Sequence, residues 1–129
     1  MRVFIADGSK TSLRRLLTLV GDIRGFELVG YSADAYGANV SIDAVKPDVV
    51  ILDLEMRGGS GIDVLKFTKQ KYPSMFFIIL TNASSEQYRK HCVELGADFF
   101  FDKSTEFSQI PVTIEQLAEK LSGGIPQKI

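Results

Sequence analysis

Short apolar runs alternate along this chain with longer segments of helical periodicity, and this alternation is what most restricts its fold. Several runs are rich in the β-branched and aromatic residues that favour strands, while the segments between them repeat apolar residues at helical spacing. Strands joined by helices return to the same end of a sheet and therefore pair in parallel. The predicted strands are residues 2–6, 26–31, 49–52, 75–80 and 99–101.

Two of these runs, residues 49–52 and 75–80, are apolar almost without interruption, which is typical of central strands that are covered on both faces. A final apolar stripe over residues 113–121 predicts the last helix. The sequence therefore predicts an α/β protein: a doubly wound, five-stranded parallel sheet with helices on both faces. We expect a single domain over residues 1–121 and a short flexible tail over residues 122–129.

The composition is that of an ordinary globular domain. A chain of 129 residues is long enough to bury more than half of the surface that it exposes when unfolded. A net charge of −1 gives no general attraction to nucleic acid or to an anionic membrane. The lone cysteine, Cys92, excludes an internal disulfide, and the sequence has no signal-peptide pattern and no membrane-spanning apolar stretch. We expect a cytoplasmic protein that binds neither nucleic acid nor membrane directly.

Four of the predicted strands end on polar residues suited to phosphoryl chemistry. Asp7 follows the first strand, Asp53 the third and Thr81 the fourth, and the pair Asp102 and Lys103 follows the fifth. In an open α/β sheet, ligands bind beyond the carboxyl ends of the strands. These residues are therefore expected to converge on one site.

The convergent residues suggest a phosphate-responsive centre. A carboxylate at a strand tip can attack phosphorus and form an acyl phosphate, which makes Asp53 the candidate nucleophile. Asp7 would help to hold Mg²⁺, which takes oxygen ligands and offsets the repulsion between carboxylate and phosphate. The Lys103 ammonium and the Thr81 hydroxyl would bind phosphoryl oxygens. Each residue alone has an ordinary explanation, as a turn or helix cap, a strand former or a solvated charge, but their joint placement favours the phosphate site.

The chain resembles the response-regulator receiver domain from residue 2 to about residue 121. The resemblance implies a flavodoxin-like fold in which Asp53 accepts phosphate from a histidine kinase or a phosphotransfer protein. It implies no enzyme activity beyond the receiver's own Mg²⁺-dependent phosphorylation and dephosphorylation, with metal ligands from Asp7, Asp53 and the backbone carbonyl of Glu55. The matching segments are PDVVILDLEM at 47–56, GGSG at 58–61, IILT at 78–81 and GADFFFDK at 96–103.

The resemblance also implies a two-state switch. In this switch, Thr81 moves toward the phosphoryl group, and an aromatic residue on the last strand, here Phe100, changes rotamer. An unknown downstream protein would read the change on the face formed by the fourth helix, the last strand and the last helix, and the chain would be a monomer or a weak homodimer. Core packing is the competing interpretation of Phe100, because it is one of three consecutive aromatic residues. No output domain follows in this sequence, so we expect either a receiver that acts alone or the receiver part of a longer protein with an effector domain.

Three positions depart from the family pattern: Gly8, Arg57, and Ser104, which follows Lys103 where proline is frequent. Receivers usually carry two adjacent acids after the first strand, whereas Gly8 follows Asp7 here, so the Mg²⁺ site is expected to be weakened. The Glu55 carboxylate is expected to lend support, directly or through water. Arg57 stands where proline is common, and its side chain has three possible partners, phosphate, another protein and solvent, of which solvent is favoured.

Two other functions compete with the phosphorelay receiver. One is a binding module that keeps the receiver fold but no longer depends on phosphate, and Gly8 is its chief support. The other is a hydrolase of the haloacid-dehalogenase type, which also uses a strand-end aspartate. Asp53-Leu54-Glu55 only partly matches that family's motif, and the chain leaves no room for a substrate cap. The phosphorelay receiver remains the leading hypothesis.

Overall fold

The computed structural model describes residues 1–121 and confirms the predicted α/β fold. Its main sheet has five parallel strands in the order β2-β1-β3-β6-β7, and a separate two-stranded sheet pairs β4 with β5. In chain order the elements are β1 (Arg2–Ala6), α1 (Lys10–Val20), β2 (Glu27–Ser32), α2 (Ala35–Val45), β3 (Val49–Leu52), β4 (Glu55–Met56), β5 (Gly59–Ser60), α3 (Gly61–Lys71), β6 (Phe76–Thr81), α4 (Glu86–Glu94), β7 (Phe99–Asp102) and α5 (Gln109–Leu121).

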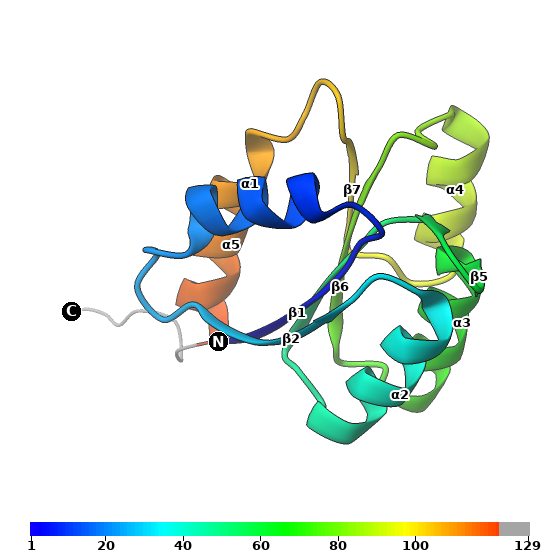
Figure 1. Cartoon of the computed structure of the whole chain (residues 1–129), viewed down its shortest axis with the longest axis horizontal. Helices are drawn as coiled ribbons and strands as arrows, with labels where there is room; N and C mark the ends of the chain where they lie inside the picture. The colour runs from blue at the N-terminus through cyan, green and yellow to red at the C-terminus, as the bar shows by residue number, and fades with distance from the viewer. Residues whose placement is uncertain (122–129) are drawn as a thin grey trace.

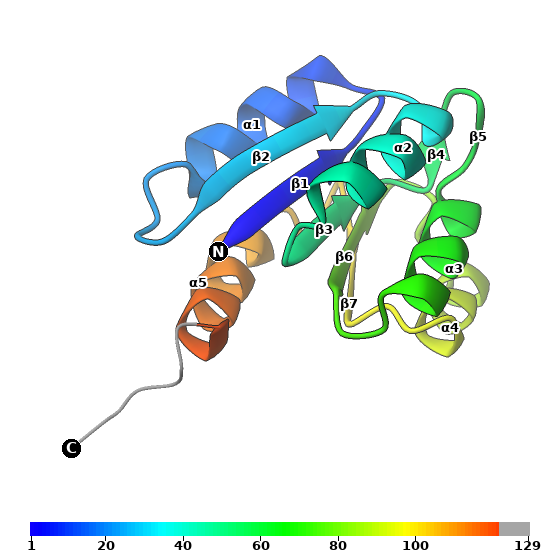
Figure 2. The ribbon, with the colours of Figure 1, turned by 90° about the horizontal axis from the view of Figure 1, so that it is seen from below.

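The helices form a layer on each face of the sheet. Helices α1 and α5 lie on one face, and α2, α3 and α4 lie on the other (Figures 1 and 2). Successive strand residues point to opposite faces, so Phe4 joins the apolar cluster beneath α2 and α3 while Ile5 joins the cluster beneath α1 and α5. All four residues of β3 are buried, as its uninterrupted apolar run predicts.

Element boundaries differ from the prediction by small amounts. The strands predicted over 26–31 and 75–80 each begin and end one residue later. Helix α5 begins at Gln109, four residues before the predicted start at 113, and it includes Pro111 in its first turn, where a missing N–H costs no helical hydrogen bond. Within the part of the chain that the structure describes, no helix combines the length and the apolarity that crossing a membrane requires.

The hairpin of β4 and β5 was not predicted. It follows β3 and reverses the chain at Arg57 and Gly58 before α3 begins. Gly58 and Gly59 have φ angles of 68° and 138°, in the region that favours glycine. The Ser60 hydroxyl then caps α3 by accepting a hydrogen bond from the backbone N–H of Ile62. The glycine-rich segment therefore forms an ordered turn beside the carboxyl ends of the strands.

Candidate functional site

The structure brings four of the predicted site residues together at the carboxyl end of the main sheet. The Lys103 ammonium donates to Asp53 Oδ2 at 2.7 Å and lies 2.8 Å from Asp7 Oδ2. The Thr81 hydroxyl donates to Asp53 Oδ1 at 2.8 Å. Both oxygens of the Asp53 carboxylate therefore have side-chain donors, one charged and one neutral.

Backbone hydrogen bonds that continue past the strands align these side chains. The N–H of Asp53 donates to the Ala6 carbonyl at 2.8 Å, which sets the end of β3 beside the end of β1. The N–H of Lys103 donates to the Thr81 carbonyl at 2.9 Å, which does the same for β7 and β6. Parallel register, which the alternation of strands and helices predicts, thus determines which residues meet.

Both aspartates also stabilise the turns that follow them. Asp7 Oδ1 accepts a hydrogen bond from the N–H of Ser9 at 2.8 Å, and Asp53 Oδ1 accepts one from the N–H of Glu55 at 3.0 Å. These are the local turn contacts that aspartate commonly makes. The turn role and the site role therefore coexist in the same carboxylates rather than excluding one another.

Burial sets the electrostatics of the cluster. The side chains of Asp7, Asp53 and Lys103 are only 4%, 6% and 9% exposed. Burial raises the pKa of Asp7 even though Lys103 donates to it. Burial also acts to lower the pKa of Lys103, but its contacts with Asp53 and Asp7 outweigh that effect and raise the pKa. Lys103 therefore stays charged and neutralises part of the negative charge of the two carboxylates.

The raised pKa of Asp7 predicts a pH-dependent stability. The native state holds the Asp7 proton more tightly than the unfolded chain does, so this group lowers the free energy of unfolding as pH rises from about 3.9 through the raised native pKa. We expect Asp7→Asn to be more stable than wild type at neutral pH, with the difference vanishing in acid. Urea unfolding across this pH range measures it, with Asp22→Asn as an exposed control. A difference that does not change with pH would contradict the prediction.

The oxygen donors at this site suit a hard cation but are fewer than the family pattern provides. Asp7 and Asp53 supply carboxylates and Glu55 supplies a backbone carbonyl, while the Glu55 side chain is exposed. A Cβ at Gly8 would lie 3.7 Å from the Glu55 carbonyl oxygen, so a side chain at position 8 would belong to the same group of donors. Within residues 1–121, no three His, Cys, Asp or Glu side chains are placed to hold a metal ion. The site therefore fits Mg²⁺ in donor type and lacks one carboxylate.

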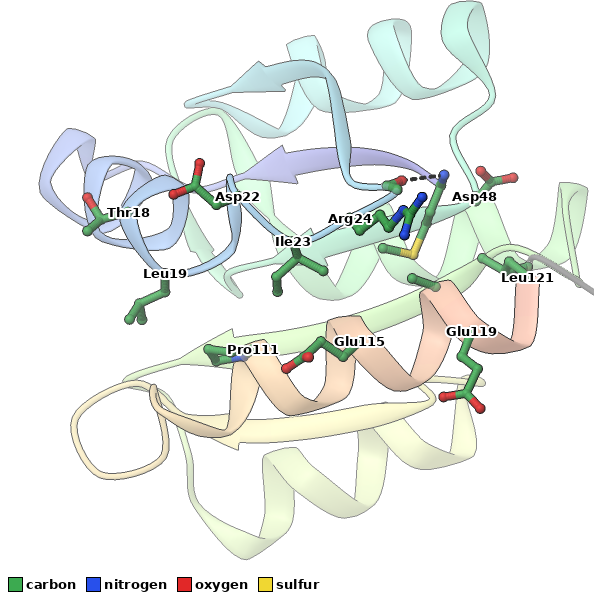
Figure 3. A pocket seen from close by; sticks show the side chains of 13 residues that line it. Thr18, Leu19, Asp22, Ile23, Arg24, Asp48, Pro111, Glu115, Glu119 and Leu121 are labelled. Atoms are coloured by element: carbon green, nitrogen blue, oxygen red, sulfur yellow. Dashed lines mark hydrogen bonds between the residues drawn. The ribbon is translucent and has the colours of Figure 1, made fainter. Parts of the chain in front are cut away.

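Cavities lie at both ends of the sheet, and the one at the carboxyl ends of the strands covers the site. It has a volume of about 470 Å³ and is lined by Gly8, Arg57 and Asn82 together with the aspartates and Lys103. The larger cavity, about 930 Å³, lies at the amino ends of the strands between α1 and α5 (Figure 3). There the Met1 ammonium donates to the Gly25 carbonyl at 2.6 Å. The four predicted site residues lie far from this larger cavity, at the opposite ends of their strands.

Asp102 does not join the site, contrary to the expectation for the fifth strand end. Its carboxylate accepts hydrogen bonds from the backbone and hydroxyl of Ser104, from the N–H of Thr105 and from the Ser84 hydroxyl. The Ser104 and Ser84 hydrogen bonds hold the pKa of Asp102 well below its ordinary range. Asp102 thus caps the turn after β7 and ties that turn to the segment before α4, while its neighbour Lys103 enters the site.

Phe100 is packed in the core in this structure. Its side chain is buried in the cluster beneath α3 and α4. The Arg89 guanidinium lies 4.7 Å from the centre of the Phe100 ring and donates to the Phe100 carbonyl at 3.0 Å. Arg89 was not singled out from the sequence, because an arginine on a short polar helix gives no signal of its partner. It connects α4 to the residue expected to change rotamer.

The sequence matches a family model and longer curated proteins. The model, described as Response regulator receiver domain, matches residues 3–115. A protein-glutamate methylesterase/protein-glutamine glutaminase of Bdellovibrio bacteriovorus is 31% identical over an alignment of 131 positions, which covers 100% of this chain and 35% of that protein. The DNA-binding transcriptional activator EvgA of Escherichia coli K12 is 31% identical over 101 residues, or 78% of this chain and 48% of that protein. The chain spans between about a third and a half of these relatives.

Solved structures agree on the fold. The response regulator domain of Thermotoga maritima CheB superimposes with a TM-score of 0.81 at 24% identity, covering 98% of each chain. At this identity the likeness concerns the arrangement of strands and helices, which is the flavodoxin-like receiver fold. The family model covers most of the chain, and the fold agrees with it. The chain belongs to the response regulator receiver domain family, whose members are two-component signalling modules.

Proposed function

We propose that Asp53 accepts a phosphoryl group from the phosphohistidine of a histidine kinase or a phosphotransfer protein, in a Mg²⁺-dependent step within the cytoplasm. The observation that supports this proposal is the buried Asp53 carboxylate, which has the Thr81 hydroxyl on one oxygen and the Lys103 ammonium on the other. When a phosphoryl group is attached to Asp53, both donors can hydrogen-bond to its negatively charged oxygens. The resulting phosphoprotein would signal through a surface that an unknown downstream protein reads.

The transfer is a single displacement at phosphorus. An Asp53 oxygen forms a bond to phosphorus while the phosphorus–nitrogen bond of phosphohistidine breaks. The bonding pair returns to the imidazole nitrogen, which takes its proton from solvent. Lys103 and Thr81 move their hydrogen bonds from the carboxylate to the phosphoryl oxygens. When bound by Asp7, Asp53 and the Glu55 carbonyl, Mg²⁺ would neutralise charge on those oxygens.

Signalling is proposed to begin with Thr81. Its hydroxyl leaves Asp53 Oδ1 for the phosphoryl group, and the space near β6 and β7 that this movement opens allows Phe100 to change rotamer. Because Arg89 contacts both the ring and the carbonyl of Phe100, the rotation would also shift α4. The readout face is therefore α4, β7 and α5, acting in a monomer or a weak homodimer.

Acetyl phosphate tests the proposal directly. Incubation with Mg²⁺ is expected to give a hydroxylamine-labile phosphoryl adduct in the intact mass of wild type, because an acyl phosphate is cleaved by that nucleophile. Asp53→Asn removes the nucleophile but keeps the size of the side chain, so it is expected to form none. An adduct of equal yield in Asp53→Asn, or none in folded wild type at high donor and Mg²⁺ concentrations, would refute the proposal.

Gly8 supports a second candidate function, a receiver-fold binding module that does not depend on phosphorylation. The site lacks one carboxylate donor, and Asp53 is already bound by Thr81 and Lys103 without phosphate. This candidate predicts that Asp53→Asn binds the downstream partner as wild type does, in the absence of any phosphodonor. Loss of partner signalling in cells by the folded variant would favour the phosphorelay instead.

A further inference from the structure

We propose that Arg57 is a second cation for the phosphoryl group on Asp53, and that it supplies positive charge which reduces the need for a metal ion. The inference rests on the proposed function and deepens it, because it assigns a phosphoryl-binding residue. Arg57 lines the cavity that also exposes Asp53, Gly8 and Lys103.

The backbone of Arg57 is held in place while its side chain is available. The N–H of Ala35 donates to the Arg57 carbonyl at 2.9 Å, and Arg57 forms an isolated parallel bridge with Asp34. The turn at Gly58, with φ of 68°, completes the reversal at the tip of the hairpin. Arg57 is exposed, and within residues 1–121 its guanidinium has no hydrogen-bond or ion-pair partner. The main chain of Arg57 is thus fixed beside the cavity, while its guanidinium is free to bind a ligand there.

Charge balance in the cavity explains why such a cation matters. The lining carries three carboxylates, from Asp7, Asp53 and Glu55, and two cations, Lys103 and Arg57, which leaves one net negative charge. A phosphoryl group adds further negative charge, since a phosphorylated side chain carries about −1.5 to −2 at neutral pH. An aspartate at position 8 and a proline at position 57, the residues usual in the family, would each make the cavity one unit more negative.

Compared with the residues usual in the family, Gly8 and Arg57 each make the net charge of the cavity one unit more positive, which is two units in all. A more negative cavity depends more strongly on a divalent cation for the approach of an anionic donor, and the two side-chain cations of this cavity lessen that dependence. A guanidinium also suits the task chemically, because its planar donors can bind two phosphoryl oxygens at once. Solvent is its partner before phosphorylation, and the phosphoryl group becomes its partner afterwards.

The test compares wild type, Arg57→Ala and Arg57→Lys during acetyl phosphate labelling across a Mg²⁺ series from limiting to saturating concentrations. We expect Arg57→Ala to slow adduct formation about tenfold at limiting Mg²⁺, the effect of one charge-assisted contact, and to shorten the adduct lifetime there. The difference in labelling rate between wild type and Arg57→Ala should narrow as the Mg²⁺ concentration rises. The labelling rate of Arg57→Lys should lie between those of the other two proteins. Arg24→Ala, which removes the same charge at an exposed position by the opposite cavity, is the matched control.

The outcomes separate this inference from the proposed function. If wild type forms the Asp53 adduct and Arg57→Ala matches it at every Mg²⁺ concentration, the role of Arg57 is refuted and the proposed function stands. The same conclusion follows if Arg24→Ala slows labelling as much as Arg57→Ala does. If no adduct forms on Asp53 in wild type under any condition, the proposed function fails and this inference fails with it.

Discussion

Replacing Lys103 with alanine is expected to lower the free energy of unfolding by about 3 kcal/mol at neutral pH, because removal of one partner from a buried ion pair leaves uncompensated charge. Lys103 lies between Asp7 and Asp53, within 2.8 Å of an oxygen of each, and all three side chains are less than 10% exposed. Without the ammonium, two buried carboxylates face each other. Adduct formation at Asp53 should fall as well, since the phosphoryl oxygens lose their charged donor.

Chemical denaturation of the variant and of a surface control measures this effect. Lys71 makes an ion pair with Asp43 at 2.6 Å, but both side chains are about half exposed, so Lys71→Ala should cost at most about 1 kcal/mol. Adding Asp53→Asn to Lys103→Ala should recover part of the loss, because only one buried carboxylate then remains. Equal losses in Lys103→Ala and Lys71→Ala would show that burial of the cluster does not govern its energetics.

The sequence predicted the convergence at the site because parallel register follows from the order of elements. Once β1, β3 and β6 are parallel neighbours, the residues at their carboxyl ends must meet at one edge of the sheet. The order of the elements therefore places Asp7, Asp53 and Thr81 at this edge without any knowledge of side-chain contacts. It could not give their distances, nor show that Lys103 contacts both aspartates, since these depend on rotamers that packing selects.

The order of the elements does not predict the partner of a residue where a loop determines that partner. Asp102 and Lys103 are adjacent at the end of β7, and the strand-end rule alone treats them alike. The structure separates them because successive residues point in opposite directions, so Asp102 turns toward Ser84 and Ser104. The hairpin beside Arg57 was missed for a related reason: two-residue strands are too short to show any alternation of apolar and polar residues.

Replacing Gly8 with aspartate is expected to raise Mg²⁺ affinity about tenfold or more, because an added carboxylate increases the charge and number of the oxygen ligands. A Cβ at position 8 would meet the Ala33 and Glu55 carbonyl oxygens at 3.6 and 3.7 Å, which is ordinary contact. The φ angle of Gly8 is not in the left-handed region, so an L-residue can adopt it. The new side chain therefore enters the group of donors without backbone strain.

Gly8→Asp is also expected to have opposite effects on the stability of the protein without and with Mg²⁺. Without Mg²⁺, the added carboxylate repels Asp7 and Asp53 and lowers stability, whereas bound Mg²⁺ restores stability by mass action. A Mg²⁺ titration followed by unfolding should therefore give a steeper rise in melting temperature for Gly8→Asp than for wild type. Gly8→Asn has nearly the same size without the charge and should follow wild type. If all three proteins bind Mg²⁺ equally, the glycine at position 8 does not weaken the metal site, and the charge balance assigned to this cavity is wrong.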